Sequence, residues 1–290
     1  MSNAPGAGRR QWDQQSHEAK VEKFYAPGAA NFSEIHGGYL NFGLWEREGM
    51  TYLEAAEQLI RTLGERAQLD ANSTLLDVAC GTGAQDLVLA KTFGPKQISG
   101  LDLTWGHVEI ARDRAKKAGL SDRLSFHHGT AVMLPFPDAS FSHVMSVEGC
   151  VHFDTREAFM REAFRVLQPG GRLVMADYDL RREPKGADKL LLSAMCEAWH
   201  VPLANRVPAT TFAGTLERIG FVEPKVEQVA EKTIPQYVRE QYTWRHFRQL
   251  SKVRGTLISA GSLVIDALVA LAYKRGILGY ILVQAEKPKG

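Results

Sequence analysis

The sequence predicts an α/β fold in which β-strands alternate with α-helices, and three observations carry this prediction. First, an apolar run at residues 75–78 leads into a glycine-rich turn and then a helix-like segment at 84–91. Second, another strand pattern at 97–103 places an acidic residue about 20 positions beyond that turn, as nucleotide-binding folds do. Third, further strand and helix patterns alternate along the chain as far as residue 177.

Composition bounds the class of protein. The chain has 290 residues, 44% hydrophobic and 23% charged, so it can bury a sizeable core in one large domain, or in one with a small cap. A net charge of +2 indicates neither a nucleic-acid-binding stripe nor an acidic tail, so we expect no nucleic acid partner. Cys80, Cys150 and Cys196 form no close pair, which favours a reducing, cytoplasmic location. No set of His, Cys and carboxylate residues has the spacing of a metal site, so we expect no metal.

Before the first strand we expect a disordered tail at residues 1–10 and a helical lid at 11–70. No leading apolar stretch resembles a signal peptide. Amphipathic helices are expected at 11–25 and 51–68, and the segment between them, 32–46, is rich in aromatic residues and glycine. Either this segment is a hydrophobic plug at the sheet edge, or it is a lid over a ligand.

The turn after the first strand has the pattern Asp-x-Ala-x-Gly-x-Gly, at Asp77, Ala79, Gly81 and Gly83. Glycines let the backbone turn sharply and approach a ligand, and the next helix begins with free N–H groups. The pattern lacks the Gly-Lys-Ser/Thr ending of a triphosphate-binding loop. Alone, it is equally consistent with an ordinary glycine turn. Asp102, after the second strand, favours a nucleotide site, because a carboxylate there can bind ribose hydroxyls.

Five motifs, in order along the chain, carry a resemblance to a known family. They are Asp77-Val-Ala-Cys-Gly-Thr-Gly83, Gly100-Leu-Asp-Leu-Thr104, Leu134-Pro-Phe136, Asp138-x-Ser-Phe141 and Arg165-Val-Leu-Gln-Pro-Gly-Gly171. Together they resemble class I S-adenosylmethionine-dependent methyltransferases. Phe24-Tyr25 followed by Asn41-Phe-Gly-Leu-Trp45 resembles the amino-terminal lid of the branch that acts on tocopherols, sterols and bacterial natural products, rebeccamycin sugar O-methyltransferase included. The resemblance as a whole spans residues 24–287 and is weakest over 181–275.

The resemblance implies a Rossmann-like seven-strand mixed sheet with helices on both faces and an α-helical lid. Residues 71–180 would bind the cofactor, 181–276 would form a helical cap and substrate region with the sixth strand, and 277–290 would form the last strand and tail. The cofactor would be S-adenosyl-L-methionine and its product S-adenosyl-L-homocysteine. The acceptor would be a small molecule methylated at oxygen, nitrogen or carbon.

The resemblance also implies two sets of site residues. Those expected to bind the cofactor are Asp77, Ala79, Gly81, Thr82, Gly83, Asp102, Leu103, Thr130, Ala131 and Val147. Those expected in the lid or against the substrate are Tyr25, Tyr39, Asn41, Trp45 and Tyr178.

At the adenine edge the chain departs from the family pattern. Relatives commonly carry an aspartate at the position of Thr130, where it accepts a hydrogen bond from the adenine amino group. A threonine hydroxyl also accepts, without charge assistance, so the Ala131 N–H gains importance. Leu103 would supply an apolar face for the purine. His107 either lies near the ribose or is an ordinary exposed helix histidine, and we favour the second.

The fourth strand, 141–147, leads into Glu148 and His152. Ligands bind beyond the carboxyl ends of strands in an open parallel sheet, so both side chains emerge where the chemistry is expected. His152 can accept the proton of an attacking hydroxyl or amine, because an ordinary histidine pKa near 6.5 suits a general base. The alternative is that its imidazole forms a structural hydrogen bond with a loop carbonyl. The resemblance favours the base, because relatives with Glu-Ser-Leu-His-His here use the histidine pair. This chain keeps the second histidine and has Val151 in place of the first.

Two further carboxylates are candidates for this site. Asp177, at the end of the fifth strand, matches an aspartate that relatives use with the histidine. A pair with His152 would fix the imidazole tautomer, and the alternative is a helix cap. Glu148 either orients His152, stabilises a developing cation, or pairs structurally with a cap residue.

The segment 235–274 is longer than a hairpin needs and predicts a helical cap over the acceptor pocket. Within it, 257–273 is apolar enough to suggest a membrane span. However, Asp266 interrupts it, and about 17 residues is the short limit for crossing a bilayer. We therefore expect a lid helix and no integral span, and leave peripheral membrane contact and the oligomeric state open.

A second function stays open beside methyl transfer. A protein of this fold can bind S-adenosylmethionine, or its product, while it steers a cyclisation or acts as a non-methylating binding module, because fold does not fix chemistry.

Overall fold

The computed structural model describes residues 17–25 and 35–290. The tail expected over 1–10, and the parts of the expected lid at 11–16 and 26–34, lie outside the described residues. Residues 17–25 form a helix, as the amphipathic pattern predicts.

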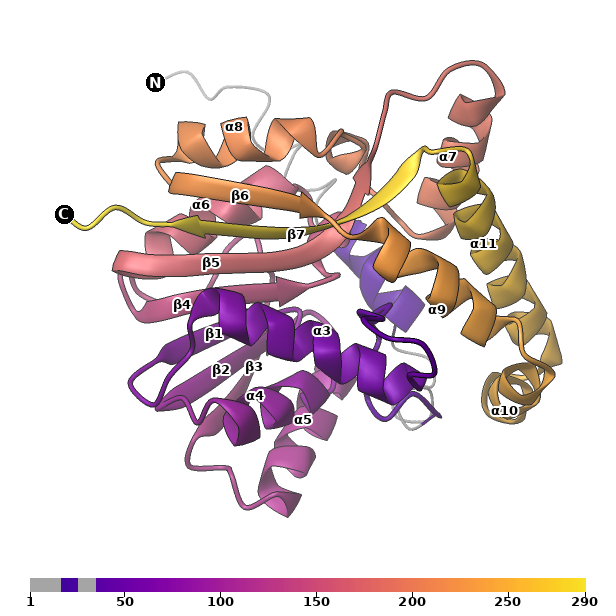
Figure 1. Ribbon diagram of the computed structural model, residues 1–290. Coiled ribbons are helices and arrows are strands. Elements are labelled where there is room, and N and C mark those ends of the chain that lie inside the picture. The colour runs from indigo at the N-terminus through magenta and orange to yellow at the C-terminus, as the bar shows by residue number, and fades with distance from the viewer. Residues whose placement is uncertain (1–16, 26–34) are drawn as a thin grey trace, which may run out of the picture.

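A seven-stranded mixed sheet forms the centre of the molecule and confirms the expected fold class (Figure 1). The strands are β1 Thr74–Val78, β2 Gln97–Asp102, β3 Leu124–His128, β4 Phe141–Val147, β5 Leu167–Leu180, β6 Val222–Gln228 and β7 Leu278–Glu286. Their order is β3-β2-β1-β4-β5-β7-β6; the first five are parallel, and β7 is antiparallel to β5 and β6. The strand order switches between β1 and β4, where open sheets of this kind bind ligands.

Helices cover both faces of this sheet (Figure 1). Beyond residue 35, the α-helices of the chain are α3 Tyr52–Ala67, α4 Ala84–Thr92, α5 Trp105–Lys117, α6 Arg156–Val166, α7 Ala187–Ala198, α8 Thr210–Ile219, α9 Ile234–Gln241, α10 Trp244–Arg254 and α11 Thr256–Lys274. Short 3-10 turns occur at Cys150–His152, Leu203–Asn205 and Ala230–Lys232.

Alternating side chains of the strands build one core on each face. Leu75 packs with α3, α4 and α5, whereas its neighbour Leu76 packs with α6 and α8 on the other face. The helix α3 was expected to be part of the lid, yet its apolar side faces the sheet. Thr51 begins it with a capping box completed by Glu54.

Two strand boundaries differ from the expected ones for local reasons. β5 begins before the expected Arg172 and includes the predicted turn, because Gly170 N donates to Lys287 O, with 2.9 Å between them. β6 ends at Gln228, not Thr233, because residues 230–232 form a 3-10 turn.

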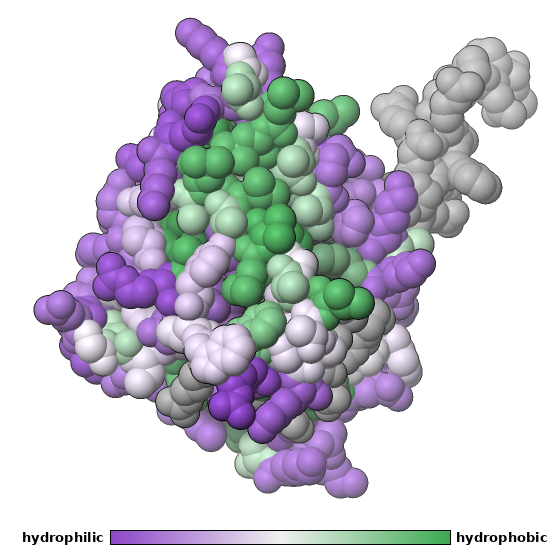
Figure 2. Space-filling model, turned by 90° about the vertical axis from the view of Figure 1, so that its right-hand side faces the viewer, coloured by the Kyte–Doolittle hydropathy of each residue, from purple (hydrophilic) through white to green (hydrophobic). Residues whose placement is uncertain are grey.

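Beyond the carboxyl ends of the strands, α7, α9, α10 and α11 form the cap (Figure 1). α11 packs against the other three helices. Among the described helices, we find none with the length and apolarity to cross a membrane. Figure 2 shows a broad apolar surface on this side of the molecule. Exposed apolar side chains of the cap include Leu190 in α7 and Leu257, Val264 and Leu271 in α11.

Candidate active site

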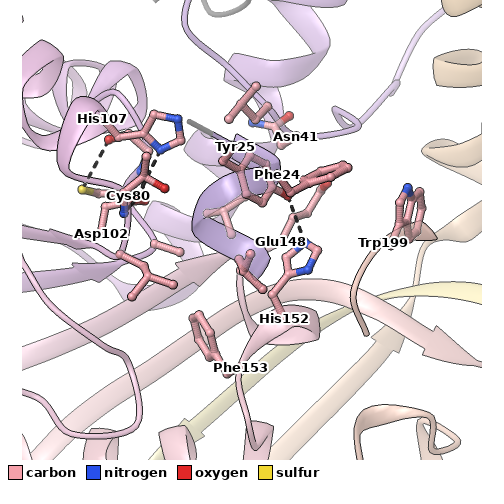
Figure 3. Close-up of a pocket in the computed structure, with 18 of the residues that line it drawn as sticks. Phe24, Tyr25, Asn41, Cys80, Asp102, His107, Glu148, His152, Phe153 and Trp199 are labelled. Atoms are coloured by element: carbon pink, nitrogen blue, oxygen red, sulfur yellow. Dashed lines mark hydrogen bonds and ion pairs between the residues drawn. The ribbon is translucent and has the colours of Figure 1, made fainter. Parts of the chain in front are cut away.

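A cavity of about 260 Å³ lies at the carboxyl ends of the strands, where their order switches (Figure 3). Its floor consists of the loops after β1, β2, β3 and β4. The helix at 17–25 and the segment 38–42 close one side, and the cap closes another. The cavity therefore has a part formed by the sheet loops and a part formed by the cap.

The glycine-rich loop after β1 turns through left-handed backbone at Ala79 (φ 64°), Gly81 (φ 55°) and Gly83 (φ 74°). Gly81 lines the cavity, and a Cβ there would meet no atom within 4 Å. Gly83 lies off the cavity wall, and a Cβ there would approach the Ala111 Cβ to 2.9 Å. Gly81 thus keeps space open for a ligand, whereas Gly83 allows α4 to pack closely on α5.

Asp102 is buried at the end of β2 and lines the cavity. Its Oδ2 accepts from Gly81 N (2.9 Å), and its Oδ1 accepts from Thr104 N (2.8 Å). Its Oδ1 also lies 3.1 Å from Nδ1 of His107. This contact corrects our expectation of an exposed His107, which is 97% buried and also lines the cavity. The carboxylate joins the glycine loop to the start of α5.

Asp77 is fully buried and does not line the cavity, so its contact with the cofactor stays a prediction. Its Oδ2 accepts from Nε2 of Gln85 (2.5 Å), and Gln85 does line the cavity. Burial raises the pKa of Asp77 to about 7. Asp77 therefore contributes to the cavity by holding the side chain of Gln85 in place.

Thr130 and Ala131 line the cavity together with Leu103, as expected for an adenine edge. The Thr130 hydroxyl donates to Oε1 of Glu18, with 2.5 Å between the oxygens. Glu18 comes from the helix at 17–25 and also lines the cavity. A carboxylate therefore lies next to the position where relatives carry an aspartate, and it comes from a distant part of the sequence.

His152 follows β4 in a 3-10 turn and lines the cavity (Figure 3). Its Nε2 is 2.9 Å from the hydroxyl of Tyr25, which we take as the donor, and its main-chain oxygen accepts from Nε2 of His17 (2.8 Å). Nδ1 is buried without a hydrogen-bond partner. Burial, followed by the charge of His17, lowers the pKa of His152 to about 4. The imidazole is therefore neutral at physiological pH and able to accept a proton.

The expected pair of Asp177 and His152 is not formed. Asp177 is fully buried, off the cavity wall, and its Oδ2 accepts from Nε of Arg156 (2.9 Å). Arg156 also donates to the main-chain oxygens of Asn205 (2.9 Å) and Tyr178 (3.1 Å). The Asn205 side chain in turn donates to the main-chain oxygens of residues 150, 151 and 153. Asp177 therefore supports the turn that carries His152 without touching the imidazole.

Glu148 does not contact His152, which excludes the orienting role that we considered for it. Its Oε1 accepts from Phe42 N (2.7 Å) and from the hydroxyl of Tyr280 (2.6 Å), and its Oε2 accepts from the hydroxyl of Tyr178. Burial raises the pKa of this carboxyl to about 7, although these three donors lower it. Glu148 thus fixes the lid segment to β5 and β7, and its role toward a developing cation stays a prediction.

The aromatic segment before α3 packs into the core and also contributes to the cavity wall, and its role as a lid over a ligand stays a prediction. Asn41 and Phe42 line the cavity, and Nδ2 of Asn41 is buried without a hydrogen-bond partner. Trp45 is buried behind them and donates from Nε1 to Phe42 O (3.0 Å). The Tyr39 side chain is also buried, off the cavity wall. Asn41 therefore offers an unused donor to a ligand.

The expected site residues fall into two groups. Those on the cavity wall are Tyr25, Asn41, Ala79, Gly81, Asp102, Leu103, Thr130, Ala131, Val147, Glu148, His152 and Tyr178. Those that lie behind the wall are Tyr39, Trp45, Asp77, Thr82, Gly83 and Asp177. The wall residues that were not anticipated are Glu18, Gln85, Trp199, Tyr237 and Asp266. Gln85 closely follows the glycine-rich loop, whereas the other four meet the site only through the tertiary fold.

These residues fit the cofactor that the sequence implies. Asp102 can accept from ribose hydroxyls, Gly81 leaves space beside it, and Asn41 Nδ2 offers a donor to a carboxylate. Over the described residues, the cavity wall contains carboxylates but no lysine or arginine, which suits a cationic ligand. Three or more potential metal ligands do not gather anywhere in the described part of the chain.

Comparisons with known proteins agree on one family. A family model described as a methyltransferase domain matches residues 76–175. The chain is 38% identical over 204 residues to erythromycin 3''-O-methyltransferase of Saccharopolyspora erythraea, over 68% of this chain and 66% of that protein. It is 30% identical over 275 residues to 27-O-demethylrifamycin SV methyltransferase of Amycolatopsis mediterranei, over 93% of this chain and 97% of that protein.

Solved structures also match over nearly the whole chain. The crystal structure of the [4+2]-cyclase SpnF matches with a TM-score of 0.76 and 28% sequence identity, over 94% of this chain and 97% of that one. Similarity in sequence and in structure thus extends beyond the strands that carry the motifs, into the lid and the cap.

Proposed function

This chain belongs to the class I S-adenosylmethionine-dependent methyltransferases, and we propose that it methylates a specialised metabolite with His152 as proton acceptor. The observation that carries the proposal is a single cavity, under the cap, whose wall contains both Asp102, at the end of β2, and His152, after β4. A cofactor held at Asp102 and an acceptor held under the cap would meet beside His152.

The cofactor part of the proposal assigns a role to each wall residue near the glycine loop. Asp102 accepts from the ribose hydroxyls, and Leu103 packs on the purine. At the adenine edge, Ala131 N–H donates, and Glu18 supplies the carboxylate that Thr130 lacks. When bound, S-adenosylmethionine supplies a methyl group on an electrophilic sulfonium.

The acceptor part of the proposal centres on His152. An acceptor hydroxyl or amine that replaces the Tyr25 hydroxyl on Nε2 lies within reach of a neutral imidazole, which takes its proton as the nucleophile attacks. Asp177 acts as a positioning residue through Arg156 and Asn205. Most of the rate should come from holding the two reactants in line, which the lid and cap do by closing around them.

An isotope-transfer assay tests this proposal. The protein is incubated with methyl-labelled S-adenosylmethionine and a metabolite extract of the source organism, and labelled products are followed by mass spectrometry. We expect a labelled small molecule, whose yield falls about 10²–10⁴-fold in His152→Ala. His127→Ala, in β3 and away from the cavity, is the matched control. No label, from protein that binds S-adenosylhomocysteine, would overturn the proposal.

The similarity to the cyclase SpnF favours one alternative, in which the same cavity binds the cofactor while it steers a cyclisation. The same assay separates the two functions. Methyl transfer increases the mass of the acceptor by one labelled methyl group, whereas cyclisation yields an isomer of unchanged mass and no label.

We further propose a cytoplasmic location with peripheral membrane contact. Cys80, Cys150 and Cys196 are free and buried, which is typical of reducing compartments. The helices α7 and α11, which carry exposed apolar side chains, also carry the exposed Lys189 and Lys274. Sedimentation with vesicles of anionic phospholipid tests the contact: wild type should bind and Leu257→Glu should not, and equal recovery of both would contradict it.

A further inference from the structure

We infer that the cap part of the cavity recognises a positively charged nitrogen on the acceptor, such as a protonated or quaternary amine, through the carboxylate of Asp266. This inference rests on the proposed function, because it names the class of acceptor that the same site would take. Asp266 lies in α11, on the cavity wall next to Ser262 and Ile265 of the same helix.

The Asp266 carboxylate has no partner of its own. Within the described residues, no hydrogen bond or ion pair reaches it, although it is half-buried in a mainly apolar helix. Burial raises its pKa to about 7. An unpaired carboxylate in such surroundings costs free energy, which a cationic ligand would recover on binding.

Aromatic rings add a second preference for a cation. Tyr237 of α9 lines the cavity, and its ring stacks on Phe42 with 3.8 Å between the centroids. Trp199, after α7, lines the cavity as well. The faces of such rings attract ammonium groups, most strongly where water is excluded. The cap thus combines a free carboxylate with aromatic walls.

The charge of the whole cavity points the same way. Among the described residues, its wall contains five carboxylates and no lysine or arginine: Glu18, Asp102, Glu148, Asp154 and Asp266. Protein donors already hold three of these carboxylates, at Glu18, Asp102 and Glu148. A phosphate or carboxylate on the acceptor would find repulsion and no cationic partner, whereas an amine finds attraction at Asp266.

The competing explanation is that Asp266 binds a hydroxyl group of a neutral acceptor, since a carboxyl group can accept or donate a hydrogen bond. The test therefore has to separate charge from hydrogen bonding. Choline and 3,3-dimethylbutan-1-ol serve as probes, because they share a hydroxyl group and nearly the same shape but differ in charge.

Binding of both probes is measured by titration calorimetry at pH 8.5 to protein saturated with S-adenosylhomocysteine, so that the cofactor part of the cavity is filled. We expect wild type to bind choline about tenfold or more tightly than 3,3-dimethylbutan-1-ol. Asp266→Asn should remove this preference. Asp154→Asn, which removes the same charge from another position on the cavity wall, should retain it. Unchanged affinity for S-adenosylhomocysteine shows that each variant is folded.

Two results would overturn the inference. Equal affinity of wild type for the two probes would exclude recognition of charge, whatever the variants do. Equal loss of choline affinity in Asp266→Asn and Asp154→Asn would assign the preference to the general field of the cavity and not to Asp266. Neither result bears on methyl transfer, which the isotope assay measures separately, so the two proposals fail independently.

Discussion

The Asp177 carboxylate accepts a hydrogen bond from Arg156, with 2.9 Å between Oδ2 and Nε, and both side chains are at least 95% buried. Burial raises the pKa of Asp177, and the charge of Arg156 partly offsets this rise. Through Arg156 and Asn205, the pair holds the turn that carries His152. The aspartate expected to pair with His152 thus supports this residue from a distance.

Loss of this pair should destabilise the fold and misplace His152. Asp177→Ala leaves a buried guanidinium unpaired, which should lower the free energy of unfolding by about 3–5 kcal/mol. Urea unfolding measures this loss. The control is Glu157→Ala, which removes the exposed partner of Arg161 and should change stability by no more than about 0.5 kcal/mol. Similar losses in both variants would contradict a structural role for the pair.

The low pKa of His152 predicts the pH dependence of turnover. Because burial lowers this pKa to about 4, the imidazole is already neutral throughout the range from about pH 5 to pH 8. An inflection of kcat/KM near pH 6.5 should therefore not come from His152, and any inflection near neutral pH should persist in the residual activity of His152→Ala. An inflection near pH 6.5 that disappears in this variant would contradict the account.

Glu148 should make the folded protein less stable as pH rises. Its pKa is 4.5 as an ordinary carboxyl and about 7 in the fold, so between these values the unfolded chain releases a proton that the folded chain keeps. The contribution of Glu148 is fully present below pH 4.5 and falls by up to about 3 kcal/mol by pH 7.

Glu148→Gln should remove this dependence. Urea unfolding at pH 5 and pH 8 should show a smaller loss of stability with pH in the variant than in wild type. Glu109→Gln, an exposed carboxylate on α5, should behave as wild type does. The same pH dependence in all three proteins would contradict the raised pKa of Glu148.

The two loop glycines should respond differently to alanine. At Gly81 a Cβ enters open space in the cavity, so Gly81→Ala should cost about 1 kcal/mol of stability, from its left-handed backbone, and should weaken cofactor binding. At Gly83 an added Cβ would also meet Ala111, which should increase the loss of folding stability by about 1–3 kcal/mol. Unfolding and S-adenosylhomocysteine titrations measure both effects. Cofactor affinity unchanged in Gly81→Ala would contradict the position of the ligand.

Local sequence signals predicted most of the sheet. Gly83 and Gly220 mark helix boundaries in the structure as expected, and apolar runs located all seven strands, with the largest boundary shifts in β5 and β6. Such elements are specified by neighbouring residues, through turn glycines and side-chain alternation. The length of the segment 235–274 predicted a helical cap, but it did not separate α9, α10 and α11 or predict their packing around the cavity.

The errors concern contacts between distant residues. Nothing near Asp177 in the sequence indicates that Arg156, at the start of α6, would take its carboxylate. His107 is buried in contact with Asp102, and the helix periodicity of the sequence does not indicate this contact. Glu18 and Asp266 reach the cavity only after the amino-terminal helix and α11 fold over it. Motifs found the residues at the strand ends, but they could not find those contributed by the lid and cap.

The contribution of Asp102 to cofactor binding tests the central claim most directly. Calorimetry of S-adenosylmethionine binding compares wild type with Asp102→Ala, and with Asp113→Ala on the exposed side of α5 as the control. We predict binding by wild type and by the control, and an affinity lower by about 1–3 kcal/mol in Asp102→Ala, the usual cost of a lost charged hydrogen-bond partner. Unchanged affinity in Asp102→Ala would contradict a cofactor site at the ends of β1 and β2.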